Sequence, residues 1–198
     1  MGESSTAMGE PLELLASWLE QARDAGVPAP GAMTVATATV DGRPSARMVS
    51  LKRLDRDGLV FTTALWTRKA DELHLNSQIA AVFYWSTLGR QARIEGRAEV
   101  AERELAEELF AARPRDHQLQ ALVSRQGETI ESIEKLRERL ARLRSETAGK
   151  SVACPPDWGA VRIVPDRIEF WDEASDRLHD RQLYEAVGGG WSRSQLAP

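Results

Sequence analysis

The stretch MTVATATVDGRPSARMVSLKRL, residues 33–54, decides the fold class of this chain. Two runs with the pattern of β-strands flank Asp41-Gly42, and an Asp-Gly pair between such runs is a strong signal for a tight hairpin. The preceding segment, residues 11–25, repeats its apolar residues at the period of a helix and ends at Gly26. The pattern therefore predicts a helix followed directly by an antiparallel sheet.

The rest of the chain continues this mixture of strands and helices. The expected strands are 59–63, 79–85, 91–100, 160–164, 167–171 and 178–184, with 191–196 as a further candidate. The expected helices are 68–76, 102–112, 116–125 and 130–144. Because hairpins dominate and no βαβ alternation is present, we expect an α+β fold, an antiparallel barrel with peripheral helices.

Composition excludes several classes of protein. The chain has 198 residues, 42% of them hydrophobic and 28% charged, which suits one globular domain over residues 11–198 after a polar, disordered tail at residues 1–10. The net charge of −4 argues against a nucleic-acid partner. No apolar run approaches the ~20 residues that cross a bilayer, and no secretory leader is visible. We therefore expect a cytoplasmic protein without a membrane partner.

Four cations lie around the expected hairpin of an otherwise acidic chain: Arg47, Lys52, Arg68 and Lys69. Cations concentrated in this way suggest a fixed anion such as a phosphate, although ordinary surface charges would give the same sequence. Arg47 and Lys52 are five residues apart, so a regular strand would place them on opposite faces. A bulge or a twist would be needed to bring them together.

A second cationic group lies near the C-terminus. Arg177, His179 and Arg181 alternate along the expected strand 178–184, so they should share one face. Three such side chains repel one another unless an anion or a carboxylate lies among them. A solvated face with acidic neighbours such as Asp180 is an equally good interpretation.

Motifs for catalysis by side chains alone are missing. His74, His117 and His179 lack the spacing of metal ligands, so no metal site is expected. There is no phosphate-binding glycine loop and no nucleophile with a spaced base. A bound organic cofactor is therefore the more attractive source of chemistry.

These features together resemble the pyridoxamine 5′-phosphate oxidase family, the flavin-binding split-barrel enzymes. The resemblance runs from about Pro11 to Pro198 and rests on motifs in a fixed order: RMVSLK (47–52), FTT (61–63), TRK (67–69), GRQ (89–91), RPRD (113–116), VSRQ (123–126), EFW (169–171) and RLHDR (177–181). It implies an antiparallel split β-barrel, a homodimer, and FMN held at the subunit interface.

The resemblance also implies roles for individual residues. The FMN contacts would be Arg47, Met48, Val49, Ser50, Leu51, Lys52, Thr62, Thr63, Arg68, Lys69, Gln91, Gln126, Gly127, Trp171 and Arg181. The substrate positions would be Lys52, Leu109, Arg113, His117, Arg177 and His179, with Arg177 and His179 beside the reacting carbon. The implied reaction is hydride transfer from C4′ of a pyridoxine or pyridoxamine 5′-phosphate to FMN, with molecular oxygen as the final acceptor and hydrogen peroxide as a product.

The chain departs from the family pattern at the substrate end. Leu109 stands where the family normally has a tyrosine, His117 where it has a serine, and Gly127 where a serine usually lies next to the flavin. These departures favour the alternative function of a similar oxidase in secondary metabolism, resembling the phenazine-biosynthesis branch. Lys52, in contrast, favours the vitamin substrate. A flavin carrier without turnover is a third possibility, against which Arg177 and His179 argue.

Overall fold

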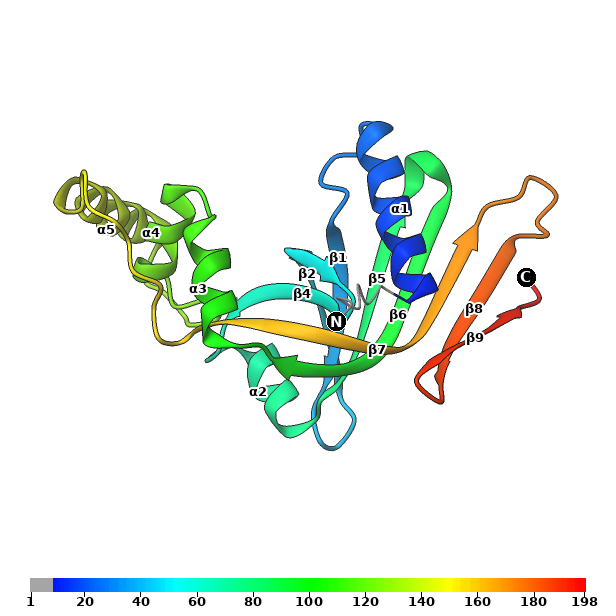
Figure 1. Cartoon of the computed structure of the whole chain (residues 1–198). Helices are drawn as coiled ribbons and strands as arrows, with labels where there is room; N and C mark the ends of the chain where they lie inside the picture. The colour runs from blue at the N-terminus through cyan, green and yellow to red at the C-terminus, as the bar shows by residue number, and fades with distance from the viewer. Residues whose placement is uncertain (1–8) are drawn as a thin grey trace, which may run out of the picture. The chain divides into compact units, whose positions relative to one another are not determined.

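The computed structural model of the chain describes residues 9–198, and residues 33–54 contain the expected hairpin (Figure 1). β1 (Ala32–Ala38) pairs antiparallel with β2 (Pro44–Ser50), and the turn between them contains Asp41 and Gly42. Every second residue of β1 is buried, whereas β2 is exposed or half-buried along its whole length. The predicted turn is confirmed.

The other elements complete one antiparallel sheet with attached helices. The remaining strands are β3 (Arg53–Asp55), β4 (Gly58–Ala64), β5 (Gln78–Trp85), β6 (Arg90–Val100), β7 (Trp158–Asp172), β8 (Asp180–Val187) and β9 (Gly190–Gln195). The helices are α1 (Glu10–Asp24), α2 (Arg68–Leu75), α3 (Arg103–Ala111), α4 (Arg115–Val123) and α5 (Ile133–Glu146), with a 3-10 turn η1 (Ser86–Leu88). Within residues 9–198 the strands follow the order β2-β1-β5-β6-β7-β4-β3, and β8 pairs with β7 and β9. The expected α+β fold, a curled antiparallel split barrel, is confirmed.

The described chain packs as two compact units. Unit 1 contains the segments up to Phe61, Glu72–Glu99 and Arg162–Pro198, and unit 2 contains Thr62–Asp71 and Val100–Val161. The expectation of a single domain over residues 11–198 stays a prediction. Residues 1–8 of the expected tail lie outside the described residues, and Glu10 already belongs to α1.

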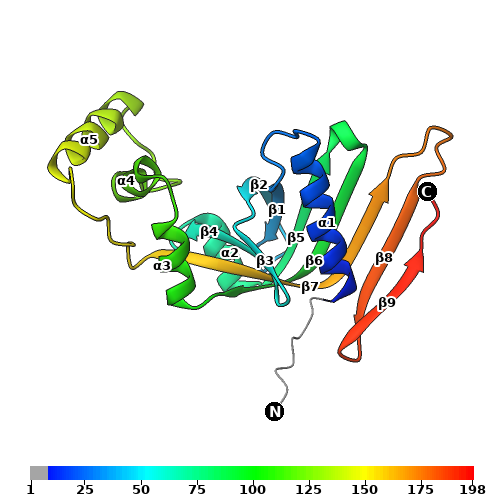
Figure 2. The ribbon, with the colours of Figure 1, turned by 45° about the horizontal axis from the view of Figure 1, so that its top comes forward.

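The core of unit 1 lies between α1 and the sheet. Figures 1 and 2 both show α1 beside β5 and β6. Trp18 of α1 is 8% exposed, and its ring meets those of Trp85 and Phe170 edge-on at 6.2 and 5.0 Å between centroids. The 3.6-residue period of residues 11–25 therefore corresponds to a buried helix face, as predicted.

Strand β7 corrects one prediction. Residues 160–164 and 167–171 were expected as two strands, but β7 runs without a break through Pro165, which lies between them. A Cβ on Gly96 would lie 2.2 Å from the Val164 oxygen, and one on Gly58 would lie 2.0 Å from the Ile163 oxygen. Glycine on both flanking strands therefore lets the backbone of β7 approach its neighbours closely enough to stay in the sheet.

Two further expected strands have different bounds. The strand expected to continue from the hairpin to Leu54 ends at Ser50, because the Lys52 amide bonds to the Val60 oxygen at 2.7 Å and β3 then pairs with β4. The strand expected from residue 178 begins at Asp180, because Arg177 has a positive φ of 70°. Both corrections arise from backbone geometry that residue alternation does not report.

The helices of unit 2 are close to their predicted positions. α5 begins at Ile133 instead of Ile130, because the Ser132 hydroxyl accepts a hydrogen bond from the Lys135 amide at 3.2 Å and caps the helix there. Pro114 is the N-cap of α4, consistent with the predicted break after α3.

Candidate functional site

Arg47 is held in a polar cluster on the β1–β2 hairpin. Its guanidinium donates to the hydroxyls of Thr37 at 2.7 Å and Ser45 at 2.6 Å, and it lies 3.5 Å from the Glu72 carboxylate. Ser45 and Arg47 share one face of β2 because they are two residues apart. This arrangement fixes the guanidinium in position.

Glu72 is a component of this cluster that the sequence analysis missed. It is 4% exposed and accepts hydrogen bonds from Thr37 and, at 2.7 Å, from Ser45. Its position on α2, three residues after Lys69, puts both residues on one helix face, and both are buried. An acidic and a basic residue at this spacing are a signal that could have identified Glu72.

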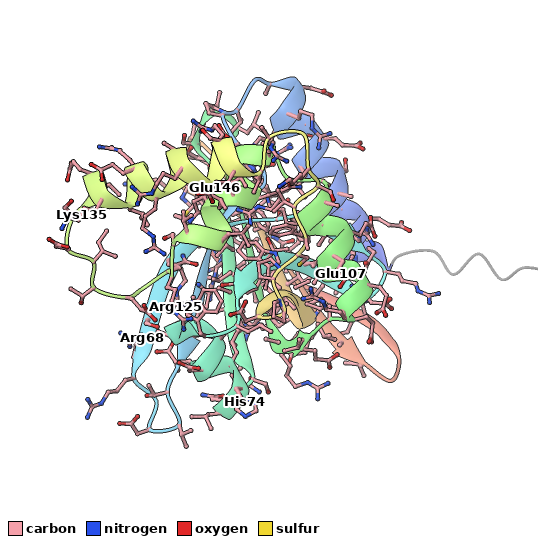
Figure 3. All side chains as sticks on the ribbon, turned by 90° about the vertical axis from the view of Figure 1, so that its left-hand side faces the viewer. Arg68, His74, Glu107, Arg125, Lys135 and Glu146 are labelled. Atoms are coloured by element: carbon pink, nitrogen blue, oxygen red, sulfur yellow. The ribbon has the colours of Figure 1, made fainter. Side chains whose placement is uncertain are left out.

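Lys69 is 6% exposed and belongs to unit 2. Its Nζ donates to the hydroxyls of Thr63 at 2.9 Å and Thr67 at 3.2 Å. The backbone carbonyl oxygen of Thr67 accepts from the amides of Ala70 and Asp71 in the first turn of α2. The structure thus brings Lys69 and Thr63, two of the predicted FMN residues, into direct contact. Arg68, the first residue of α2, is exposed (Figure 3).

Lys52 lies in the break between β2 and β3, and its side chain is exposed. It lines a pocket of about 430 Å³ in unit 1, together with residues of α1 and residues 51–54. The parity argument from a regular strand does not apply to Arg47 and Lys52, because no single strand contains both. Within unit 1, Arg47 lies in the polar cluster with Glu72, whereas Lys52 lines the pocket beside α1.

Trp171 and Arg181 face each other in the β7–β8 register. Arg181 donates to one oxygen of Glu169 from two nitrogens, at 2.8 and 2.7 Å, and to the Ala197 oxygen at 2.8 Å. Glu169 is 5% exposed and also pairs with Arg93 at 3.0 Å. Glu169, which the sequence analysis did not single out, is therefore the carboxylate that neutralises Arg181, together with Arg93.

The prediction that Arg177, His179 and Arg181 share one strand face is wrong. Arg177 is exposed in the turn before β8, where its positive φ turns the chain. His179 Nδ1 accepts a hydrogen bond from the Ala174 amide at 3.1 Å, and its ring lies 4.7 Å from that of Trp171. The neutral ring then carries its proton on Nε2, which is left as the donor.

The expected substrate residues of unit 2 lie on or beside α3 and α4. Leu109 is half-buried, His117 is exposed, and Arg113 stacks on Trp158 with its Cζ 4.1 Å from the ring centroid. Burial lowers the pKa of Arg113 from its ordinary value, and the nearby Cys154 opposes this shift. Arg113 is the member of this set that is both cationic and substantially desolvated.

The remaining predicted residues are spread along the sheet and one loop. Gln91, half-buried on β6, lies opposite Tyr84 of β5. Val49, Leu51 and Thr62 are half-buried, Ser50 is exposed, and Met48 is 63% exposed and accepts from the Thr34 hydroxyl at 3.0 Å. Gln126 and Gly127 lie exposed in the loop after α4.

Neither a metal centre nor a membrane span is found in the described part of the chain. Among residues 9–198, no group of three or more His, Cys, Asp or Glu side chains could hold a metal ion. Across the same residues, none of the helices has the length and apolar character to cross a bilayer.

Comparison with known proteins places the chain in a family. A family model described as pyridoxamine 5′-phosphate oxidase matches residues 19–172, and one described as pyridoxine 5′-phosphate oxidase C-terminal dimerisation region matches residues 158–198. The chain belongs to the pyridoxamine 5′-phosphate oxidase family. This confirms the resemblance seen in the sequence motifs, and with it the expectation of an oxidoreductase.

Individual relatives cover almost the whole chain. The pyridoxine/pyridoxamine 5′-phosphate oxidase of Rubrobacter xylanophilus is 48% identical, over 96% of this chain and 87% of the relative. The structure of PhzG from Burkholderia lata 383, in complex with tetrahydrophenazine-1-carboxylic acid, superposes with a TM-score of 0.91 at 34% identity, over 100% of this chain and 97% of PhzG. A pyridoxamine 5′-phosphate oxidase-related, FMN-binding protein of Nostoc punctiforme, at 16% identity, shares the fold with a TM-score of 0.81, over 98% of this chain and 100% of that protein.

Proposed function

We propose that this chain is an FMN-dependent oxidase that converts pyridoxine or pyridoxamine 5′-phosphate to pyridoxal 5′-phosphate. The observation that carries the proposal is the 48% identity, over 96% of the chain, to a pyridoxine/pyridoxamine 5′-phosphate oxidase. With pyridoxine 5′-phosphate, an alcohol at C4′, oxygen takes up two electrons and two protons and leaves as hydrogen peroxide. With pyridoxamine 5′-phosphate, an amine at C4′, a water molecule is also consumed and ammonia is released.

The residues present fit a phosphorylated flavin. In unit 1, Arg47 is fixed by three side-chain partners and the Val35 oxygen, and in unit 2, Lys69 is buried with two threonine hydroxyls. Cations held in this way bind phosphate oxygens without first losing side-chain freedom. We propose that Arg47, Lys52, Arg68 and Lys69 bind the FMN phosphate and flavin edge, with Thr62, Thr63, Gln91, Gln126, Trp171 and Arg181 as further contacts. FMN, when bound, supplies the acceptor for the C4′ hydride.

The proposed substrate residues perform the remaining tasks. Arg113 and Lys52 bind the substrate phosphate through their charges. His179 is oriented by the Ala174 amide and the Trp171 ring, so its Nε2 proton is available to the oxygen or nitrogen on C4′. Arg177, in its turn with positive φ, orients the same end of the substrate.

We also propose that the enzyme is a homodimer. The matched dimerisation region covers residues 158–198, which include Trp171, Arg177, His179 and Arg181. In a dimer, these residues of one chain would complete the site of its partner.

The proposed cofactor and activity have a direct test. Purified protein should be yellow because of bound FMN and should release peroxide with pyridoxine 5′-phosphate. Protein that stays colourless after addition of FMN would disprove the cofactor assignment.

The second candidate is an oxidase of a reduced polycyclic acid. It is favoured by the likeness to PhzG and by the absence of hydroxyls at Leu109 and His117. Two hydrogen bonds of ~0.5–1.5 kcal/mol each correspond to roughly ten- to a hundredfold in affinity, so activity on the vitamin should be weak. The double variant Leu109→Tyr, His117→Ser should lower KM for pyridoxine 5′-phosphate, whereas His74→Ser, an exposed histidine outside the set, should not.

Peroxide assays with both substrates separate the two candidates. If the double variant gains nothing while the parent oxidises tetrahydrophenazine-1-carboxylic acid readily, the polycyclic substrate replaces the vitamin. If the parent oxidises pyridoxine 5′-phosphate and leaves the phenazine unchanged, the vitamin assignment holds.

A further inference from the structure

Arg113 and Trp158 form a stacked pair in which two buried nitrogens lack acceptors. The Arg113 Cζ lies 4.1 Å from the Trp158 ring centroid, and the Phe110 ring meets Trp158 edge-on at 5.8 Å. Arg113 Nη1 and Trp158 Nε1 are both buried and have no hydrogen-bond partner among residues 9–198. A buried donor without an acceptor is destabilising, so such donors in native proteins usually have a partner. The acceptor for these two nitrogens must therefore come from outside residues 9–198.

The charge around this pair indicates what that acceptor is. Within the described residues, Arg113 makes no ion pair with a carboxylate, and burial disfavours its charged form. The indole of Trp158 can only donate. An anion whose oxygens only accept would satisfy both nitrogens and also neutralise the guanidinium, whereas a water molecule would leave the charge uncompensated. A phosphate monoester has the required charge and geometry.

The backbone of Trp158 is fixed independently of its side chain. Arg103 donates to the oxygens of Trp158 at 2.9 Å and Cys154 at 3.0 Å, and the Trp158 amide donates to the Pro155 oxygen at 3.0 Å. The indole is therefore anchored at its base and packed against both Arg113 and Phe110. Its N–H is pre-organised, so binding a ligand costs little additional ordering.

We propose that Trp158 binds the substrate and sets its specificity, with its indole N–H and Arg113 donating to the substrate's phosphate group. This inference rests on the proposed function and adds a residue that the sequence analysis did not assign. Leu109, next to Phe110 on α3, supplies no donor, so the indole provides one from β7. The preference for a phosphorylated over an unphosphorylated substrate then depends on Trp158 as well as on the cations.

The test replaces the indole by a ring without a donor. Trp158→Phe keeps an aromatic ring under Arg113 and removes the N–H together with part of the indole surface. The matched control is Trp66→Phe, because Trp66 also has a buried Nε1 without a partner and lies under Arg125 at 4.8 Å, but is not among the proposed substrate residues. The probe is 4-deoxypyridoxine 5′-phosphate, whose C4 methyl group cannot be oxidised in this reaction, titrated calorimetrically into the FMN-loaded protein.

We expect Trp158→Phe to raise the Kd of this probe about tenfold, or ~1.4 kcal/mol, and Trp66→Phe to leave it within about twofold. With pyridoxine 5′-phosphate, KM should rise by a similar factor while kcat stays within about twofold, because the lost contact is made equally in the ground and transition states. Unphosphorylated pyridoxine should show no difference between the wild type and Trp158→Phe.

An unchanged Kd in Trp158→Phe, or an equal loss in Trp66→Phe, overturns the inference while the wild type still binds the probe and oxidises the substrate. A wild type that does neither overturns the proposed function as well. Should Trp158→Phe fail to fold, the wild type itself gives the answer by NMR. The indole N–H signal with a contact to the Phe110 ring must shift when the probe is added, and a signal that does not move rules the hydrogen bond out.

Discussion

Arg47 pairs with the buried carboxylate of Glu72 and, in the proposed function, also binds the FMN phosphate. Replacing Arg47 with alanine should lower FMN affinity by roughly ten- to a hundredfold, because a charge-assisted hydrogen bond contributes ~1.5–3 kcal/mol. Fluorescence titration of the apoprotein with FMN measures this. The same change leaves Glu72 without its cation, so we also expect lower thermal stability.

The matched control for Arg47 lies on the same hairpin. Arg43 is 81% exposed and pairs with Asp41 at 3.0 Å, so Arg43→Ala should change neither FMN affinity nor stability appreciably. Equal FMN affinity in Arg47→Ala and Arg43→Ala would remove Arg47 from the cofactor site.

Ionisation of the Asp55 carboxyl on β3 makes the free energy of unfolding depend on pH. Burial raises its pKa, but hydrogen bonds from Arg162 and the Asp57 amide outweigh this, so the pKa lies below its ordinary value of 3.8. A lowered pKa in the folded state means that the stabilisation is complete above the unfolded pKa, near ~3.9, and is lost as pH falls through the folded value.

Asp55→Asn should therefore lower the free energy of unfolding by about 1 kcal/mol at neutral pH, and the difference from the wild type should shrink as pH falls below ~3.9 and vanish below the folded-state pKa. Urea unfolding at fixed protein concentration across this range measures it. Asp166→Asn, an exposed aspartate on β7, should change stability by about 0.5 kcal/mol or less. A deficit of Asp55→Asn that persists at low pH would contradict an electrostatic origin.

At the scale of elements, β7 depends on the glycines of its neighbours. An alanine at Gly96 would place its Cβ 2.2 Å from the Val164 oxygen and 2.8 Å from the Pro165 Cα, so the backbone must shift. We expect Gly96→Ala to destabilise the protein by about 1–3 kcal/mol, measured by urea unfolding. At Gly31 the nearest atom would lie at 3.5 Å, an ordinary contact, and Gly31→Ala should cost about 0.5 kcal/mol or less. Similar losses for the two variants would show that close packing against β7 is not the cause.

At the scale of the whole molecule, the proposed homodimer predicts how the protein sediments. The FMN-loaded protein should sediment at micromolar concentration with twice the mass of one chain, because residues 158–198 match a dimerisation region. Removing FMN should weaken the dimer if the flavin contacts are shared between chains, since a ligand that binds only the dimer stabilises it. An FMN-loaded monomer with full activity would contradict both expectations.

The sequence by itself determined the elements whose signals are local. The Asp41-Gly42 turn sets the β1–β2 hairpin, and the apolar period of residues 11–25 sets α1, because both depend on residues within a few positions of one another. The ordered motifs from RMVSLK to RLHDR were also sufficient to indicate the family. The assigned cofactor and substrate roles remain predictions at the level of single residues.

Only the tertiary structure decided which side chains meet and where strands end. β2 stops at Ser50 because the Lys52 amide bonds to Val60, and the single strand expected up to Leu54 becomes two. Glu72 bonds to Ser45 across 27 residues, and the two nitrogens without acceptors at Arg113 and Trp158 lie 45 positions apart. Residue alternation reports the face of a single element, whereas these contacts depend on how distant elements pack, which no local pattern encodes.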